Sequence, residues 1–179
     1  MKIIYGEQKT NNKSIRLDEK AVFDGFRKPE NIRYLPQFNF IPGNLTLKRI
    51  FKDFYLNFST LISYFPEFEK YHDSKLKNLS EGERRIVEIY AILASETKFC
   101  MLDEPFSQVM PVHVDTIKRI INEEKKNKGI ILTDHLYEHI VDVYDEIYVL
   151  TNGTTYLTKE KQDLIKLGYL NDKNGQEKT

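Results

Sequence analysis

The sequence predicts an α/β fold in which a mostly parallel β-sheet carries helices on its faces. The first observation is that strand-like runs alternate with helical patterns, as expected for crossover connections between parallel strands. The second is that the runs 99–102 and 130–132 are apolar without alternation, which is typical of strands buried on both faces of a sheet. The elements expected in this half of the chain are strand 97–102, helix 111–127, strand 129–134, helix 136–143 and strand 146–151.

The other elements follow from spacing and from turn residues. A short strand is expected at 14–18, and another at 31–35 ends before Pro36. A helix-rich block then extends from about residue 45 to 93, with apolar residues at three- to four-residue spacing near its start. Asn152-Gly153 marks a turn before strand 154–158 and helix 159–167, and 171–179 is expected to be a frayed end.

Composition narrows the class of protein. With 179 residues, 40% of them hydrophobic, the chain can bury one sizeable core, and its length favours one domain. Lys plus Arg and Asp plus Glu are equal at 27 each, so the charge balance gives no case for nucleic-acid binding. The one cysteine, Cys100, cannot form an internal disulfide, which fits a reducing compartment. No run approaches the ~20 apolar residues of a membrane helix, so we expect a soluble protein whose membrane role comes through a partner.

Two adjacent carboxylates, Asp103 and Glu104, follow the apolar strand 97–102. An isolated carboxylate in a dry site carries a desolvation penalty of several kcal/mol. The pair is therefore best explained if Mg²⁺ and a phosphate-bound water meet it. The alternative is a solvated turn marked by Pro105.

Ser80 and Glu83 have the spacing of a capping box, which predicts a helix start and explains both residues structurally. The same geometry has a functional interpretation. A hydroxyl at Ser80, the amide of Gly82 and the positive end of a helix dipole suit a phosphate oxygen.

Gln37 and His135 each follow a predicted strand. Gln37 stands in a Pro-bounded loop, where an amide side chain could reach a metal ion or a water; an ordinary polar loop residue is the alternative. His135 ends the strand that neighbours the one bearing Asp103 and Glu104, and ligands of doubly wound sheets bind at such strand ends. A structural histidine is the alternative there.

Taken in order, Gln37, the segment 79–83, Asp103-Glu104 and His135 resemble the ATP-binding cassette (ABC) family, specifically the nucleotide-binding subunit of an ABC transporter. The resemblance implies a P-loop NTPase-like fold that uses ATP and Mg²⁺. By this resemblance Gln37 is the Q-loop glutamine near Mg²⁺, Ser80, Gly82 and Glu83 belong to the nucleotide-binding signature, Asp103 is the Walker B carboxylate that binds Mg²⁺, Glu104 is the general base, and His135 is the switch histidine on the γ-phosphate.

The sequence departs from the family pattern at three places. It contains no G-x-x-x-x-G-K-[ST] phosphate loop, and its first seven residues resemble the end of the helix that follows this loop. We therefore expect the chain to be a fragment that lacks the N-terminal strands and the loop, and that binds ATP poorly by itself. Glu81 stands where the signature usually has Gly, and Met110 where the family usually has an aspartate.

The resemblance also gives an organisation and a function. The expectation is one partial ABC-type ATPase domain over 1–179, with a helical subdomain at 45–96, a Walker B and H-loop sheet region at 97–158, and a C-terminal helix and tail at 159–179. The implied function is ATP-driven transport, with a transmembrane permease and a second nucleotide-binding subunit as partners, at the cytoplasmic face of the cell membrane. The alternative from another class is a non-catalytic cassette that regulates an intact partner. A soluble cassette for DNA repair or translation is disfavoured by the single cassette and the absence of a basic excess.

Overall fold

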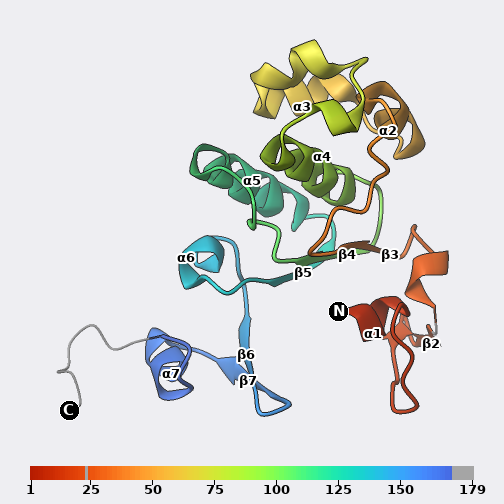
Figure 1. The fold of residues 1–179 in the computed structure, drawn as a ribbon. Helices are drawn as coiled ribbons and strands as arrows, with labels where there is room; N and C mark the ends of the chain where they lie inside the picture. Colours follow the sequence, from red (N-terminus) through yellow and green to blue (C-terminus); the bar gives the residue numbers. More distant parts are fainter. Residues whose placement is uncertain (23, 171–179) are drawn as a thin grey trace. The chain divides into compact units, whose positions relative to one another are not determined.

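The computed structural model describes residues 1–22 and 24–170, so the expected frayed end at 171–179 lies outside the described residues. The described residues form two compact units, and the second one begins at Leu136. Figure 1 shows the elements along the chain. The first unit contains α1 (Lys2–Tyr5), β1 (Arg16–Leu17), β2 (Lys20–Ala21), η1 (Gly25–Arg27), β3 (Ile32–Leu35), α2 (Leu47–Asp53), α3 (Phe58–Tyr64), η2 (Pro66–Tyr71), η3 (Leu76–Asn78), α4 (Glu81–Leu93), β4 (Phe99–Asp103), α5 (Pro111–Glu124) and β5 (Gly129–Thr133).

The centre of the first unit is a three-stranded parallel sheet in the order β3-β4-β5. Long segments of the chain connect its strands, and the helices in these segments provide the crossovers that parallel pairing requires. Asp103 at the end of β4 pairs in register with Thr133 at the end of β5. The carboxyl ends of all three strands therefore lie at one edge of the sheet.

Both faces of this sheet are packed. Ile32, Tyr34 and Met101 form a core cluster against which Met1 and Ile4 pack, so α1 covers one face. Helices α4 and α5 contact each other, and α4 contacts β3 and β4 (Figure 1). Cys100 and Leu102 are fully buried in β4. Burial raises the pKa of the Cys100 thiol to about 12, so this residue packs as an apolar group.

The prediction that residues 130–132 are buried on both faces is wrong. Within the described residues β5 is an edge strand of its sheet, and Ile131 is 45% exposed. An apolar run without alternation reports only that a strand can be buried, and the strand order decides which strand stands at the edge.

Helix α4 begins where the sequence predicts. Ser80 is its N-cap and forms the expected capping box with Glu83. In the helical block of α2, α3, η2 and η3, Phe51, Phe65 and Phe68 are buried, whereas Phe54 and Phe58 are half-buried.

The second unit contains α6 (Tyr137–Ile140), β6 (Ile147–Thr151), β7 (Thr154–Thr158) and α7 (Lys161–Lys166). Strands β6 and β7 form an antiparallel hairpin around the Asn152-Gly153 turn, where both residues have positive φ. The predicted elements are present, but α6 is only one turn long. No helix among the described residues has both the length and the apolar character needed to span a bilayer.

Candidate functional site

Three strand ends bring four of the predicted site residues together. Gln37 follows β3, Asp103 ends β4 and Glu104 comes directly after it, and His135 follows β5. The Gln37 Nε2 atom donates a hydrogen bond of 2.8 Å to Glu104 Oε2. His135 Nε2 lies 2.5 Å from the other oxygen, Glu104 Oε1. Parallel pairing of β3, β4 and β5 is what converts positions far apart in sequence into one cluster.

The two adjacent carboxylates have different surroundings. Asp103 accepts hydrogen bonds from the hydroxyls of Tyr34 (2.7 Å) and Thr133 (2.9 Å), both of which belong to the flanking strands. Burial, reinforced by the hydrogen bond to Asp103, raises the pKa of the Tyr34 phenol, which keeps this group a neutral donor. Asp103 is thus held by the sheet, whereas Glu104 is held by side chains from loops.

Glu104 has a backbone conformation that L-residues rarely adopt, with φ of 48°. Its amide donates to the Thr133 carbonyl (3.0 Å), and its own carbonyl accepts from Ser107 Oγ (2.8 Å). The strain at such a residue, of order 1–3 kcal/mol, persists only when surrounding contacts fix it. The side chain is turned toward Gln37 and His135 as a result.

Ser80, Gly82 and Glu83 lie at the start of α4, where Ser80 and Glu83 hydrogen-bond to each other rather than to the Glu104 cluster. Ser80 Oγ donates to Glu83 Oε2 (2.7 Å), which also accepts from the Ser80 amide (2.8 Å). A Cβ atom on Gly82 would stand 2.9 Å from the Gln108 carbonyl, so this position requires glycine to let α4 approach the loop after Glu104. Met110 is the N-cap of α5 and is 58% exposed.

The residues present are compatible with Mg²⁺ held partly by a nucleotide. Mg²⁺ is commonly bound by one or two carboxylates together with waters and substrate phosphates. Asp103 supplies a carboxylate, and Gln37 an amide oxygen. In the part of the chain that the structure describes, no group of three His, Cys, Asp or Glu side chains forms a closed metal cage. An open, phosphate-completed site is therefore the kind of metal site that this donor set can make.

Four residues that hold this cluster or its loops in place were not predicted from the sequence. Arg85 and Glu88 in α4 are fully buried, and Arg85 donates to the carbonyls of Asp103 (3.1 Å) and Glu104 (3.2 Å). Tyr34 and Thr133 were also missed. A signal was available for the first two, because charged residues inside an apolar helix interior are rarely buried without a partner.

Comparison with known proteins gives the family. The family description "ABC transporter" matches residues 1–107. The ATP-binding protein LptB of the lipopolysaccharide export system from Escherichia coli K12 is 42% identical over 86 residues, which cover 48% of this chain and 36% of the relative. LptB from Acidithiobacillus ferridurans is 34% identical over 94 residues, covering 52% of this chain and 39% of the relative. The chain thus matches little more than a third of the length of these relatives.

Solved structures give the fold. An ATP-binding subunit of an ABC transporter has a TM-score of 0.78 at 21% identity, over 96% of this chain and 77% of that chain. A nucleotide-free ATP-binding cassette has a TM-score of 0.71 at 17% identity, over 95% of this chain and 78% of that chain. These likenesses show the predicted P-loop NTPase-like α/β fold, and with the family match over residues 1–107 they lead to one conclusion: the chain belongs to the ABC transporter family, as one of its ATP-binding cassettes.

Proposed function

We propose that this chain is part of an ATP-binding subunit that drives transport across a membrane, and that it carries the groups acting on water and the γ-phosphate. The observation that carries the proposal is the meeting of Gln37, Glu104 and His135 at one sheet edge, with Asp103 beside them. The matched relatives include ATP-binding proteins of transport systems. The proposal covers ATP-driven transport and names no transported substrate.

In this proposal Glu104 accepts the proton of the attacking water. A carboxylate can do so when one oxygen is within about 3 Å of that water. Gln37 holds Oε2 of Glu104, and His135 contacts Oε1, so the His135 contact has to open for Oε1 to accept a proton. The His135 side chain is 82% exposed, so little packing opposes the opening of this contact.

Asp103 is the proposed Mg²⁺ ligand, with Gln37 acting partly through water. When bound, Mg²⁺ and ATP supply charge neutralisation at the phosphates and the phosphoryl group that water attacks. The role of Asp103 is to hold its carboxylate in place through Tyr34 and Thr133, both neutral donors that leave its charge for the metal.

The start of α4 is proposed to face a nucleotide held by a second cassette. Ser80, the Gly82 amide and the helix dipole would meet the phosphate, and two such chains would close as a two-fold dimer. Glu81 lies in the first turn of α4 and brings negative charge near that phosphate. We expect this charge to weaken the contact relative to a signature with glycine there.

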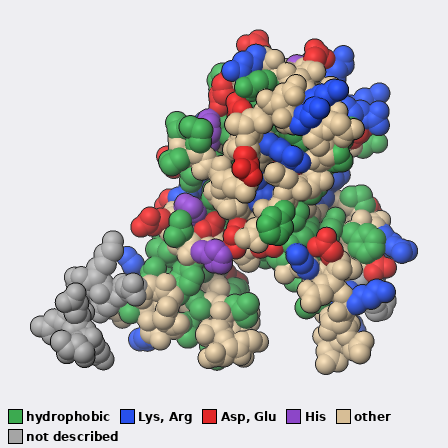
Figure 2. All heavy atoms as spheres, viewed as in Figure 1, with side chains coloured by type: hydrophobic (Ala, Val, Ile, Leu, Met, Phe, Trp, Pro, Cys, Tyr) green, Lys and Arg blue, Asp and Glu red, His purple; other side chains and the backbone are tan. Residues whose placement is uncertain are grey.

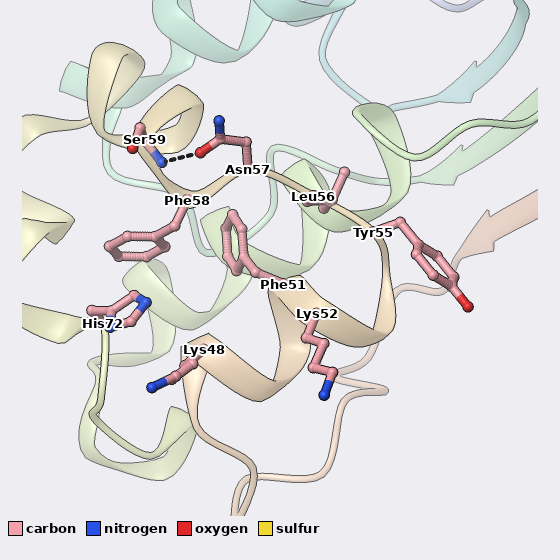
Figure 3. A pocket seen from close by; sticks show the side chains of 9 residues that line it. All are labelled: Lys48, Phe51, Lys52, Tyr55, Leu56, Asn57, Phe58, Ser59 and His72. Atoms are coloured by element: carbon pink, nitrogen blue, oxygen red, sulfur yellow. Dashed lines mark hydrogen bonds between the residues drawn. The ribbon is translucent and has the colours of Figure 1, made fainter.

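The helical block is proposed to meet a transmembrane permease. A hollow of about 720 Å³ opens between α2, the turn after it and α3. Figure 3 shows Phe51 and Phe58 in its floor, with Lys48 and Lys52 on one wall and Tyr55 projecting outward. Lys and Arg side chains gather over the helical block in Figure 2. Such an aromatic and basic surface suits an acidic amphipathic segment of the permease. The proposed permease surface contains none of the candidate catalytic residues.

The test of the catalytic proposal supplies the missing motif. A strand, phosphate loop and helix from a matched relative are fused before Met1, and Mg-ATP turnover is measured. We expect hydrolysis in the fusion, an ATP-dependent dimer when Glu104→Gln blocks turnover, and loss of that dimer with Ser80→Arg added. A fusion that binds Mg-ATP but has no turnover above that of its Glu104→Gln variant would contradict the catalytic role.

A second candidate function is a non-catalytic cassette that lends its signature to an intact partner. Glu81 and Met110, which stand where the family usually has glycine and aspartate, favour it. The fusion separates the two proposals. A catalytically inactive fusion that nevertheless stimulates an intact cassette would support the second one.

A further inference from the structure

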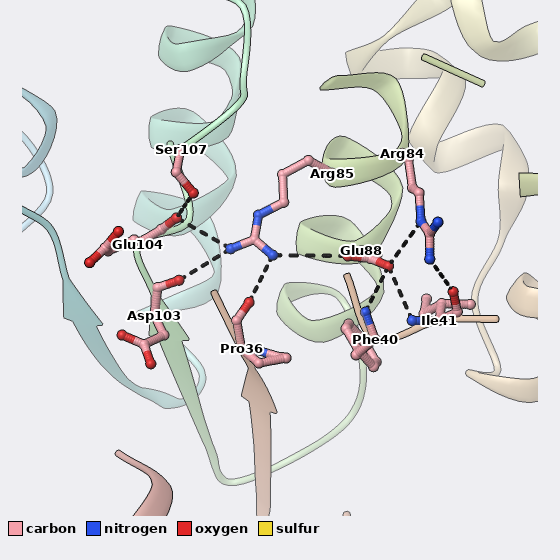
Figure 4. A network of polar contacts seen from close by, with 9 residues as sticks. All are labelled: Pro36, Phe40, Ile41, Arg84, Arg85, Glu88, Asp103, Glu104 and Ser107. Carbon is pink, nitrogen blue, oxygen red and sulfur yellow. Dashed lines mark hydrogen bonds and ion pairs between the residues drawn. The ribbon is translucent and has the colours of Figure 1, made fainter. Parts of the chain in front are cut away.

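Helix α4 contains a buried charged cluster, made of Arg84, Arg85 and Glu88, beneath the candidate site. The Arg85 and Glu88 side chains are both 0% exposed, and they form an ion pair of 3.9 Å. Arg84 Nε lies 3.5 Å from the same carboxylate. Figure 4 shows the cluster between the loop after β3 and the end of β4.

Arg85 connects two strand ends with one planar group. Its NH1 atom donates 2.8 Å to the carbonyl of Pro36, the residue before Gln37. Its NH2 atom donates to the carbonyls of Asp103 and Glu104. A guanidinium presents its donors in a fixed fork, so these acceptors are held at a set separation.

Glu88 fixes the far end of the same loop. Its Oε1 atom accepts from the backbone amides of Phe40 and Ile41, each at 3.1 Å. Arg84 NH2 donates 2.5 Å to the Ile41 carbonyl. The loop 36–41 is therefore attached to α4 at both ends, and Gln37 lies between the two attachments.

Stability alone is a weak reason for such a cluster. Buried ion pairs are often no more stabilising than well-packed apolar residues of similar volume. Burial lowers the pKa of the Arg85 guanidinium, and burial raises the pKa of the Glu88 carboxyl, although the Ile41 amide and the two arginines oppose the latter. Glu88 Oε2 has no hydrogen-bond partner among the described residues. What the cluster provides is a defined position for the loop and for Glu104.

We propose that Arg85 and Glu88 are positioning residues that hold Gln37 and Glu104 in register with α4. A displacement of α4 at its Ser80 end then moves the Gln37 loop and the candidate base together. This inference rests on the proposed function for the roles of Gln37 and Glu104. Its structural content, the attachment of the loop to α4, is independent of nucleotide.

The test is hydrogen exchange by NMR on the full chain without nucleotide. Glu88→Gln preserves shape and removes the charge that strengthens the two amide hydrogen bonds. Charged hydrogen bonds are about twice as strong as neutral ones, so we expect exchange at Phe40 and Ile41 to rise ~10-fold. The control is Arg49→Gln in the exposed Arg49–Asp53 pair of α2, which should leave both amides unchanged.

A second variant keeps the test decisive if Glu88→Gln fails to fold. Arg84→Lys retains the charge near Glu88 but loses the fork that reaches Ile41, and Arg84 is 23% exposed. In Arg84→Lys we expect exchange at Ile41 to rise ~3-fold. In Arg85→Lys we expect the His135 imidazole resonances to change. Unchanged loop exchange would overturn the proposal. So would an equal increase at Cys100–Leu102 in β4, because that pattern is a general loss of stability. Neither result depends on whether the chain binds ATP.

Discussion

The carboxyl ends of β3, β4 and β5 and the start of α4 contribute to the same proposed function, but they are built in different ways. At the strand ends, Glu104 is contacted by Gln37 and His135, which are 67 and 31 positions away in sequence. At the start of α4, Ser80 exchanges its side-chain hydrogen bonds with Glu83, three positions further along the chain. One region is assembled by the fold, and the other by local helix capping.

The difference has a consequence for experiments. A local cap costs about 1 kcal/mol when removed and leaves the fold intact. A site assembled from three strand ends depends on every element that positions the strands. Substitutions beneath the sheet edge should therefore have larger effects than substitutions at the α4 start, even though both regions face the proposed nucleotide.

The largest effect is expected at Arg85. Arg85→Met leaves Glu88 buried beside one remaining arginine and removes the Arg85 hydrogen bonds to three carbonyls, of which that of Glu104 keeps Ser107 as a donor. Breaking a buried ion pair costs about 3–5 kcal/mol. Chemical denaturation of the variant measures this loss, with Arg49→Met as the exposed counterpart, for which a much smaller loss is expected. Equal losses in the two variants would remove the distinction between the regions.

Next is the candidate base. In the phosphate-loop fusion, Glu104→Gln should lower turnover by ~10²-fold or more while ATP binding is retained, because the substitution keeps the hydrogen bonds and removes the basicity. Single-turnover kinetics and a nucleotide titration measure the two quantities. Unchanged turnover would move the role of base to another group, with His135 the next candidate.

A smaller effect is expected at Ser80. Ser80→Ala removes the cap acceptor that the Glu83 amide uses at 3.3 Å and should cost about 1 kcal/mol. A thermal melt of the chain measures it. A loss as large as that of Arg85→Met would show that the start of α4 is not a purely local structure.

The smallest effect is a pH dependence at Glu83. Burial opposes ionisation of this carboxyl, but hydrogen bonds from Ser80 and Tyr71 outweigh it and lower the pKa of Glu83 below its usual value of 4.5. A carboxyl with a depressed folded-state pKa contributes stability above its unfolded pKa, and this contribution is lost as pH falls through the folded value. The stability difference between the native chain and Glu83→Gln should therefore shrink below about pH 4.5. A difference that stays constant to pH 3 would contradict this assignment.

The sequence predicts the local elements well and the three-dimensional site in part. The α4 start, the β4 strand and the hairpin at Asn152-Gly153 follow from capping, apolar runs and turn residues. The edge position of β5 did not follow, because strand order is a property of the whole sheet. Tyr34 and Thr133 were missed for a related reason: they meet Asp103 only through strand register.

Neither Arg85 nor Glu88 was singled out from the sequence. Their burial depends on the loop 36–41 crossing over α4, a contact between residues more than forty positions apart. The family resemblance identified Gln37 and Glu104 but gave no information about what holds them.

The central claim is that this chain contributes the groups facing water and the γ-phosphate, without the main phosphate cradle. Calorimetry with Mg-ATP on the chain alone and on the phosphate-loop fusion tests it most directly. We predict a dissociation constant above ~100 μM for the chain alone and at or below ~10 μM, about −7 kcal/mol, for the fusion. A dissociation constant at or below ~10 μM for the chain alone, or a fusion that binds no better than the chain, would contradict the claim.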